Sequence, residues 1–318
     1  MPNPCIPLSP FSNYLIINGS SLSLRKGPPQ YPFPWFRLRV TFLSNWLSEP
    51  HPKLLHTWQS SSAGIPYFYA LHRIMKLRLI KFFKDFLLWS GILRIFSPFN
   101  HLFLFTRNFN LLRRWIAKTN KTPLLINDFY SWKRDYPKRF KLYEAVAAEY
   151  NLDKKELVYL EFGVASGSSF FWWLKKNTHP DSIFRGFDTF EGLPEDWGGF
   201  KKGAMAFSPG EVISDDPRAG FEKGIFQHSL NPFIESNKEL LRSKPKLIHL
   251  DADLFSSTIF VLSQLYPCIN KGDIILFDEF NVANHEFFAH QIFTESFYVK
   301  LRAIGGVNNF YQTAFIVE

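Results

Sequence analysis

Cysteine is scarce in this 318-residue sequence, which contains only Cys5 and Cys268. Two cysteines cannot build a disulfide framework or a cysteine-rich zinc site, so both kinds of stapled domain are excluded. Such scarcity is typical of a reducing compartment, and we expect a cytoplasmic protein. Disorder of the whole chain is also excluded, because hydrophobic residues make up 46% of the sequence and charged residues only 20%.

Long apolar runs and a basic leader are both missing from the first part of the sequence. The longest uncharged stretch there, residues 54–72, contains two histidines and a Gln-Ser-Ser-Ser run. A membrane span needs about 20 mostly apolar residues, so this stretch is not predicted to be one. Residues 1–11 hold no Lys or Arg, and we therefore expect no secretory signal.

Acidic residues are almost absent from residues 1–122, which hold 16 Lys or Arg against Glu49 and Asp85. Residues 123–318 hold the other 21 basic residues and 26 acidic ones. This asymmetry divides the chain into two kinds of sequence. The acidic part is unsuited to nucleic acid, and we expect no such partner, whereas the basic part could contact an anionic surface.

The basic part itself has two segments. Residues 1–74 hold 11 of the 21 prolines and 10 serines, without helical or strand periodicity. We expect a basic Pro/Ser-rich tail, which is either a disordered arm or not native, with translation beginning at Met75. Residues 75–122 are predicted to be a basic amphipathic helical segment. Its stretch 75–118 would either contact an anionic membrane peripherally or pack on the main domain or on another subunit of a homo-oligomer.

Residues 123–318 alternate between strand and helix patterns. We predict strands at 158–162, 183–187, 246–250, 273–277 and 310–317, and helices at 136–150, 168–176, 257–265 and 286–297. Residues 190–228 form a long polar stretch with glycine and proline. The alternation indicates an α/β fold in which a parallel sheet is covered by helices on both faces.

Acidic residues stand at or near the carboxyl ends of four predicted strands. They are Glu161, Asp188, the pair Asp251 and Asp253, and the pair Asp278 and Glu279. Ligands of open α/β sheets bind at the carboxyl ends of the strands. The sequence therefore predicts an acidic binding site at one edge of the sheet.

A glycine-containing turn follows the first strand. Gly163 and Gly167 allow a tight turn and a close approach of the backbone to a ligand. The dinucleotide fingerprint would need glycine at 163, 165 and 168, but Ala165 and Ser168 stand there. This argues against an NAD-dependent oxidoreductase, although the turn could also be purely structural.

Two carboxylates beside this turn favour a donor with cationic groups. Glu161 would repel a pyrophosphate but would suit the ammonium and sulfonium of S-adenosylmethionine. Asp188 stands where a carboxylate can accept hydrogen bonds from a ribose diol. The predicted cofactor-binding residues are Glu161, Gly163, Gly167, Ser168 and Asp188.

The remaining carboxylates indicate a hard metal ion. Asp251, Asp253, Asp278 and Glu279 would repel one another without a cation or a shared proton. Oxygen ligands favour Mg²⁺ over zinc, and a nearby carboxylate could take the proton of a substrate hydroxyl. Asp253 could instead cap the following helix, and His249 is expected to be a buried core residue.

Four motifs occur in order: LEFGVASGSS, FRGFDTFEGLPEDW, HLDADLFSST and GDIILFDEF. Together they resemble the macrocin O-methyltransferase (TylF-type) family of class I S-adenosylmethionine-dependent methyltransferases. The resemblance implies a Rossmann-like, seven-stranded, mostly parallel sheet with an antiparallel last strand. It further implies methyl transfer to a hydroxyl, typically of a sugar, often with Mg²⁺. The alternatives are a protein that binds S-adenosylmethionine without catalysis and an NAD-dependent oxidoreductase.

The resemblance also assigns roles within the carboxylate set. Asp251, Asp278 and Glu279 would be metal ligands, and Asp253 would be the general base. The family usually has two aspartates where this chain has Asp278 and Glu279. Glutamate is longer by one methylene, so the geometry of this pair can differ from the family's.

Overall fold

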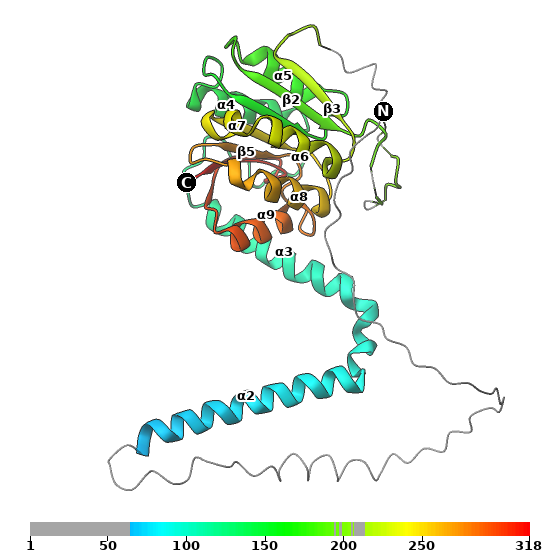
Figure 1. Cartoon of the computed structure of the whole chain (residues 1–318), viewed down its shortest axis with the longest axis vertical. Coiled ribbons are helices and arrows are strands. Elements are labelled where there is room, and N and C mark those ends of the chain that lie inside the picture. Colours follow the sequence, from blue (N-terminus) through cyan, green and yellow to red (C-terminus); the bar gives the residue numbers. More distant parts are fainter. Residues whose placement is uncertain (1–63, 194, 197–198, 205, 207–213) are drawn as a thin grey trace, which may run out of the picture. The chain divides into compact units, whose positions relative to one another are not determined.

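The computed structural model describes residues 64–318 except 194, 197–198, 205 and 207–213. The chain divides into two compact units, residues 1–86 and 87–318. The tail predicted for residues 1–74 lies, as far as residue 63, outside the described residues. In the first unit the described part is helical, and the second unit contains the α/β domain (Figure 1).

The described residues form one seven-stranded sheet with the strand order β3-β2-β1-β4-β5-β7-β6. The strands are β1 Val158–Phe162, β2 Ile183–Asp188, β3 Ala219–Lys223, β4 Lys246–Leu250, β5 Ile274–Phe277, β6 Leu301–Val307 and β7 Gln312–Val317. The pairs from β3 through β5 are parallel, and β7 runs antiparallel to both of its neighbours. The predicted mostly parallel sheet with an antiparallel last strand is therefore confirmed.

Helices cover both faces of the sheet. The second-unit helices that do so include α4 Lys138–Tyr150, α5 Ser168–Lys176, α6 Phe226–Ser236, α7 Lys238–Ser243, α8 Phe255–Leu265 and α9 Glu286–Phe297. Side chains of α4 and α5 share one hydrophobic cluster with the sheet, and side chains of α6 to α9 share the other. Because both faces are covered, the central strands are apolar along almost their whole length.

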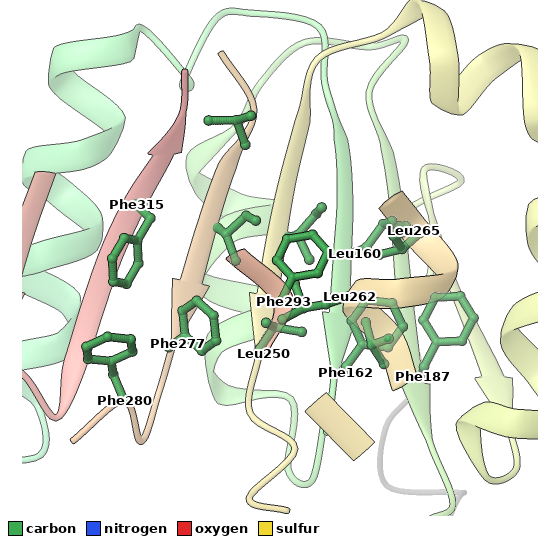
Figure 2. Packing of buried hydrophobic residues seen from close by; sticks show 14 of the residues in the cluster. Leu160, Phe162, Phe187, Leu250, Leu262, Leu265, Phe277, Phe280, Phe293 and Phe315 are labelled. Atoms are coloured by element: carbon green, nitrogen blue, oxygen red, sulfur yellow. The ribbon is translucent and has the colours of Figure 1, made fainter. Parts of the chain in front are cut away.

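Neighbouring strand residues point to opposite clusters. In β1, Tyr159 packs with the α4 and α5 side, whereas Leu160 and Phe162 pack with the other side. Figure 2 shows this second cluster, with Phe277 of β5 and Phe293 of α9. The alternation is the two-residue period of a strand, and it fixes which side chains reach the site at the strand ends.

Three further helical elements precede the sheet. They are α2 Gly64–Ser90, the 3-10 helix η1 Ile92–Phe99 and α3 Asn100–Thr119. Helix α2 begins eleven residues before Met75, so the predicted boundary at 74/75 falls inside a helix. Within the described part of the chain, none of the helices has both the length and the apolarity needed to cross a membrane.

Two strands were not predicted, and each has a physical reason. β3 lies at the edge of the sheet inside the polar stretch 190–228, and its residues are only half-buried or exposed. β6 contains Gly305 and Gly306 and has an irregularity between Ala303 and Gly305. A side chain at Gly305 would lie 2.8 Å from Leu142 of α4, so close helix packing explains this glycine.

Candidate active site

A cavity of about 330 Å³ opens at the carboxyl ends of the central strands. Four of the five predicted cofactor residues line it, namely Glu161, Gly163, Ser168 and Asp188, together with Asp251, Asp253 and Glu279. Gly167 and Asp278 do not line it. The topology thus brings most of the predicted site residues together, although their roles stay predictions.

Gly163 is required by both its conformation and its surroundings. Its φ is +93°, and a Cβ there would lie 1.9 Å from the carbonyl oxygen of Asp251. The turn after β1 therefore rests directly on the end of β4. Gly167 has φ +76°, and a Cβ there would lie 2.5 Å from the ring of Phe171. Both glycines are needed for the turn that begins α5.

Asp188 holds the same turn from the end of β2. Its Oδ2 accepts the backbone N–H groups of Val164 at 2.8 Å and Ala165 at 2.9 Å. Its Oδ1 accepts the N–H of Phe190 at 2.7 Å. A carboxylate offers about four acceptor positions, so three of them are used and one is left. The predicted ribose contact would use that position.

Glu161 is fully buried and ends a chain of hydrogen bonds. Tyr159 donates its hydroxyl proton to Glu161, and its oxygen lies 3.0 Å from Nδ1 of His249. Nε2 of His249 lies 3.2 Å from the hydroxyl of Tyr143, which lies 3.3 Å from Oγ of Ser169. With Tyr159 donating to Glu161, Nδ1 of His249 carries a proton and donates it to the Tyr159 oxygen. This buried chain fixes the Glu161 carboxylate from behind the cavity.

Asp251 and Asp278 lie side by side at the carboxyl ends of the neighbouring strands β4 and β5. The N–H of Asp251 donates to Phe162 and that of Asp278 donates to Leu250, which continues the strand pairing. Three side chains here could share one ion, namely Asp251, Asp278 and His249. Each offers one ligand atom, and these three atoms all lie within 4.8 Å of one another. This is the arrangement expected of a cation site, but both nitrogens of His249 already face tyrosine hydroxyls.

The charge balance around Asp278 also fits a cation. Its Oδ2 accepts the hydroxyl proton of Tyr136 at 2.5 Å and lies 3.7 Å from a guanidinium nitrogen of Arg139. Its Oδ1 is buried and has no hydrogen-bond partner among the described residues. Burial, and then the neighbouring charges of Asp278 and Asp253, raise the pKa of Asp251 well above its usual range. A divalent ion would give the buried oxygen of Asp278 a partner, and its charge would stabilise the ionised form of the neighbouring carboxylates.

Asp253 and Glu279 form a separate pair. Burial raises the pKa of Asp253 to about 6, although its contact with Glu279 lowers it. Burial likewise raises the pKa of Glu279 to about 8, and Tyr311 donates a hydrogen bond to it. Glu279 is not in the group formed by Asp251, Asp278 and His249 among the described residues. Asp253 has φ +56°, an uncommon conformation for a residue with a side chain.

Sequence reasoning missed Tyr136 and Arg139, which line the cavity beside the carboxylates. A signal for Arg139 was available in the pattern of α4. Leu142, Tyr143 and Val146 follow it at helical spacing and are fully buried. An arginine on the buried face of a helix needs a partner, and Asp278 supplies one.

Comparisons with known proteins found a family model and several solved structures that are similar to parts of the chain. Residues 211–309 match the family model described as macrocin-O-methyltransferase (TylF). No curated protein sequence matches the chain. Solved structures similar to the chain include CalS11, a calicheamicin methyltransferase, at 20% identity over 66% of this chain and 91% of that one, with a TM-score of 0.47.

Two other similar structures are also O-methyltransferases. NovP is 19% identical over 54% of this chain and 74% of its own, with a TM-score of 0.39. An enzyme from Bacillus cereus in complex with SAH is 15% identical over 66% of this chain and 89% of its own, with a TM-score of 0.34. At sequence identities of 20% or less, these similarities do not indicate which substrate this chain binds.

The sheet with its antiparallel last strand, and the acidic cavity beside a glycine turn, are the features expected from the sequence for an S-adenosylmethionine-dependent methyltransferase. The similarity to the macrocin-O-methyltransferase (TylF) family model lies in residues 211–309, from just before β3 to the turn before β7. This confirms the resemblance predicted from the sequence, and it supports O-methylation as the reaction.

Proposed function

We propose that this protein transfers the methyl group of S-adenosylmethionine to a hydroxyl of a small hydroxylated acceptor, such as a sugar, with Asp253 as the general base. The observation that carries the proposal is one cavity that holds Glu161, Asp188 and Asp253 together. A donor site and a proton acceptor in the same cavity are what a direct transfer between two bound reactants needs.

The donor is proposed to bind over the turn after β1. Gly163, Gly167 and Ser168 would let the backbone approach it closely. Glu161 would face its cationic amino acid portion, and Asp188 would accept a ribose hydroxyl at its remaining acceptor position. The alignment of donor and acceptor, rather than any covalent intermediate, would supply much of the rate.

Asp253 is proposed to take the acceptor proton. A general base works best when its pKa lies near the working pH, and the pKa of Asp253 is raised to about 6. Its strained backbone at φ +56° holds the carboxylate in the cavity, beside Glu279. The proton would pass from the acceptor hydroxyl to a carboxylate oxygen of Asp253 as the methyl group is transferred.

Mg²⁺ is proposed as a resident ion held by Asp251 and Asp278, with Glu279 as the third predicted ligand. The unpartnered oxygen of Asp278 supports this set, and Glu279 would join it by giving up its contact with Asp253. When bound, the ion would offset the charge of the cluster and lower the pKa of a nearby acceptor hydroxyl. Tyr136 donates a hydrogen bond to Asp278 and Arg139 lies 3.7 Å from it, so both would help to hold this carboxylate in place.

The acceptor class follows from the resemblance and from the polar part of the lining. Thr189 and Gln227 line the cavity together with Tyr136. The amide of Gln227 can both donate and accept hydrogen bonds. The hydroxyl of Tyr136 already donates to Asp278 and that of Thr189 to Gly192, so these two oxygens can serve as acceptors for the hydroxyls of a polyhydroxylated molecule. A sugar or a related small molecule therefore fits the site better than a purely apolar acceptor.

The experiment that tests the proposal is methyl transfer from S-adenosylmethionine by the full chain, measured as release of S-adenosylhomocysteine with a panel of free and glycosidic sugars. Asp253→Asn should bind the donor normally and lose about 100-fold or more of the turnover, because the general base is gone. Turnover at the wild-type rate in that variant would remove Asp253 from the mechanism. Donor binding without release for any acceptor would instead support the non-catalytic alternative.

A further inference from the structure

A basic and aromatic segment, residues 72–109, precedes the α/β domain and is exposed along most of its length. It holds seven Lys or Arg and one acid, Asp85, which pairs with Lys84 at 3.4 Å. Its large apolar side chains are exposed as well, in numbers far above the single exposed residues normal for a soluble surface. The methyltransferase site uses none of these residues.

In helix α2 one face is apolar, and Leu77, Ile80 and Leu88 are also exposed on the side that carries the lysines. Met75, Leu79, Phe82 and Phe86 recur at three- and four-residue spacing and are 62%, 54%, 36% and 41% exposed. Residues at this spacing lie above one another on one side of a helix. The lysines at 76, 81 and 84 lie away from this face. The helix therefore combines an apolar face with a mixed face of lysines and apolar residues, and both kinds of side chain suit an anionic lipid interface.

The second unit has exposed apolar side chains of its own. Ile95, Phe96 and Phe99 of η1 are at least half exposed, as are Leu102 and Phe103 at the start of α3. The ring of Phe103 contacts the rings of Phe96 and Phe99 at centroid distances of 6.4 and 6.3 Å. The rings gather on one surface but stay open to solvent.

The second half of α3 joins this surface to the α/β domain. Asn108 is buried and donates to Oδ1 of Asn284 at 3.0 Å. Leu112 is buried in the core cluster, and Trp115 packs on Phe280 and Phe315. One continuous helix thus begins in the exposed apolar surface and ends in the core of the enzyme.

We propose that residues 72–109 bind the surface of an anionic phospholipid bilayer. The net positive charge complements lipid headgroups, and the apolar side chains match the acyl boundary beneath them. No helix in the described part of the chain is suited to span the bilayer, so the segment lies on it. A second copy of the chain is a poorer occupant, because it would bring like charges together. This proposal is independent of the methyl-transfer reaction.

The test is sedimentation of the full-length protein with large vesicles of phosphatidylcholine alone or with one third phosphatidylglycerol. The protein should bind the anionic vesicles and be released at about 1 M NaCl, where the Debye length is only about 3 Å. Reversing three charges, in Lys76→Glu/Lys81→Glu/Lys84→Glu, should lower partitioning by about 100-fold, since each basic residue near the surface accounts for roughly fivefold. A second variant, Met75→Ser/Leu79→Ser, should also weaken binding.

The matched control is Lys154→Glu/Lys155→Glu/Lys175→Glu, which makes the same change of charge at exposed lysines of the α/β domain. It should bind like the wild type, and circular dichroism should show that all variants are folded. Failure of the folded wild type to bind anionic vesicles would overturn the proposal. Equal loss in the control, or binding to neutral vesicles that the reversals leave unchanged, would also overturn it. A stable wild-type dimer that ignores vesicles and dissociates in the Met75/Leu79 variant would assign the surface to a second copy instead.

Discussion

Gly163 is the single residue whose replacement should damage the site most directly. An alanine Cβ would overlap the carbonyl of Asp251 at 1.9 Å, and φ +93° is unfavourable for alanine. Gly163→Ala should therefore cost at least about 3 kcal/mol in the free energy of unfolding and abolish donor binding. Urea denaturation and calorimetric titration of S-adenosylmethionine measure the two effects.

Gly272→Ala is a matched control for that prediction. Its φ is +92°, and a Cβ there would meet nothing within 4 Å. It should cost only the backbone strain of about 1–2 kcal/mol and leave donor affinity unchanged. Equal effects of the two substitutions would contradict the close approach of the turn to the end of β4.

Tyr159 is predicted to be a positioning residue for Glu161. Tyr159→Phe removes the donor to the Glu161 carboxylate and leaves a proton of His249 without its acceptor. Affinity for S-adenosylmethionine should fall by about tenfold, the effect of one buried hydrogen bond to a charged group. The readout that separates positioning from general damage is a double-mutant cycle. In a Glu161→Ala background, Tyr159→Phe should have no further effect on affinity, and a full additional loss would contradict this role.

The carboxylates of the site could be predicted at residue scale because each follows an apolar strand directly. Their division into two pairs could not, since it depends on side-chain directions beyond the strand ends. Glu279 contacts Asp253 and Tyr311, whereas Asp278 contacts Tyr136 and lies near Arg139. Tyr136 and Tyr311 are distant from these carboxylates in sequence, so no spacing pattern in the sequence could have predicted the contacts.

Among the strands, those buried on both faces were the ones whose positions the sequence predicted best. β1, β4 and β5 are buried on both faces, and their apolar runs were predicted within a residue of their ends. β3 was missed because an edge strand needs few apolar residues, and β6 because its two glycines interrupt the pattern. Helices α6 and α7 were missed as well: α6 begins inside the polar stretch 190–228 and contains Pro232, and α7 is only six residues long.

Helix α9 carries a prediction of its own through His290. The side chain is buried against Phe280 and Phe315, and neither ring nitrogen has a hydrogen-bond partner among the described residues. Burial lowers its pKa to about 3. The unfolded chain takes up a proton below about pH 6.5, but the folded protein does not do so until about pH 3. The free energy of unfolding should therefore fall on acidification by about 1.4 kcal/mol per pH unit from this residue alone.

His290→Met removes that group and keeps an apolar side chain of similar size. The loss of stability between about pH 7 and about pH 5 should shrink by roughly 2 kcal/mol relative to the wild type. His228→Met, at an exposed position, should leave the pH dependence unchanged. An unchanged pH dependence in His290→Met would show that the imidazole is protonated in the folded protein.

At the scale of the whole molecule, the charge asymmetry of the sequence coincides with a division of tasks. The acidic part of the chain folds into the α/β domain with its carboxylate-lined cavity. The described basic part is helical and exposes aromatic and cationic side chains instead of burying them. Helix α3 is shared by both, because its first half is exposed and one side of its second half packs on the core. An acceptor that reaches the enzyme at a lipid surface would be compatible with both proposals.

The central claim is that the cavity binds S-adenosylmethionine, and calorimetric titration of the full chain with and without Mg²⁺ tests it most directly. We expect micromolar affinity, about −8 kcal/mol of binding free energy, that is retained in Asp253→Asn and lost in Gly163→Ala. No heat of binding in either condition, from protein shown to be folded, would contradict the assignment of this cavity to the methyl donor.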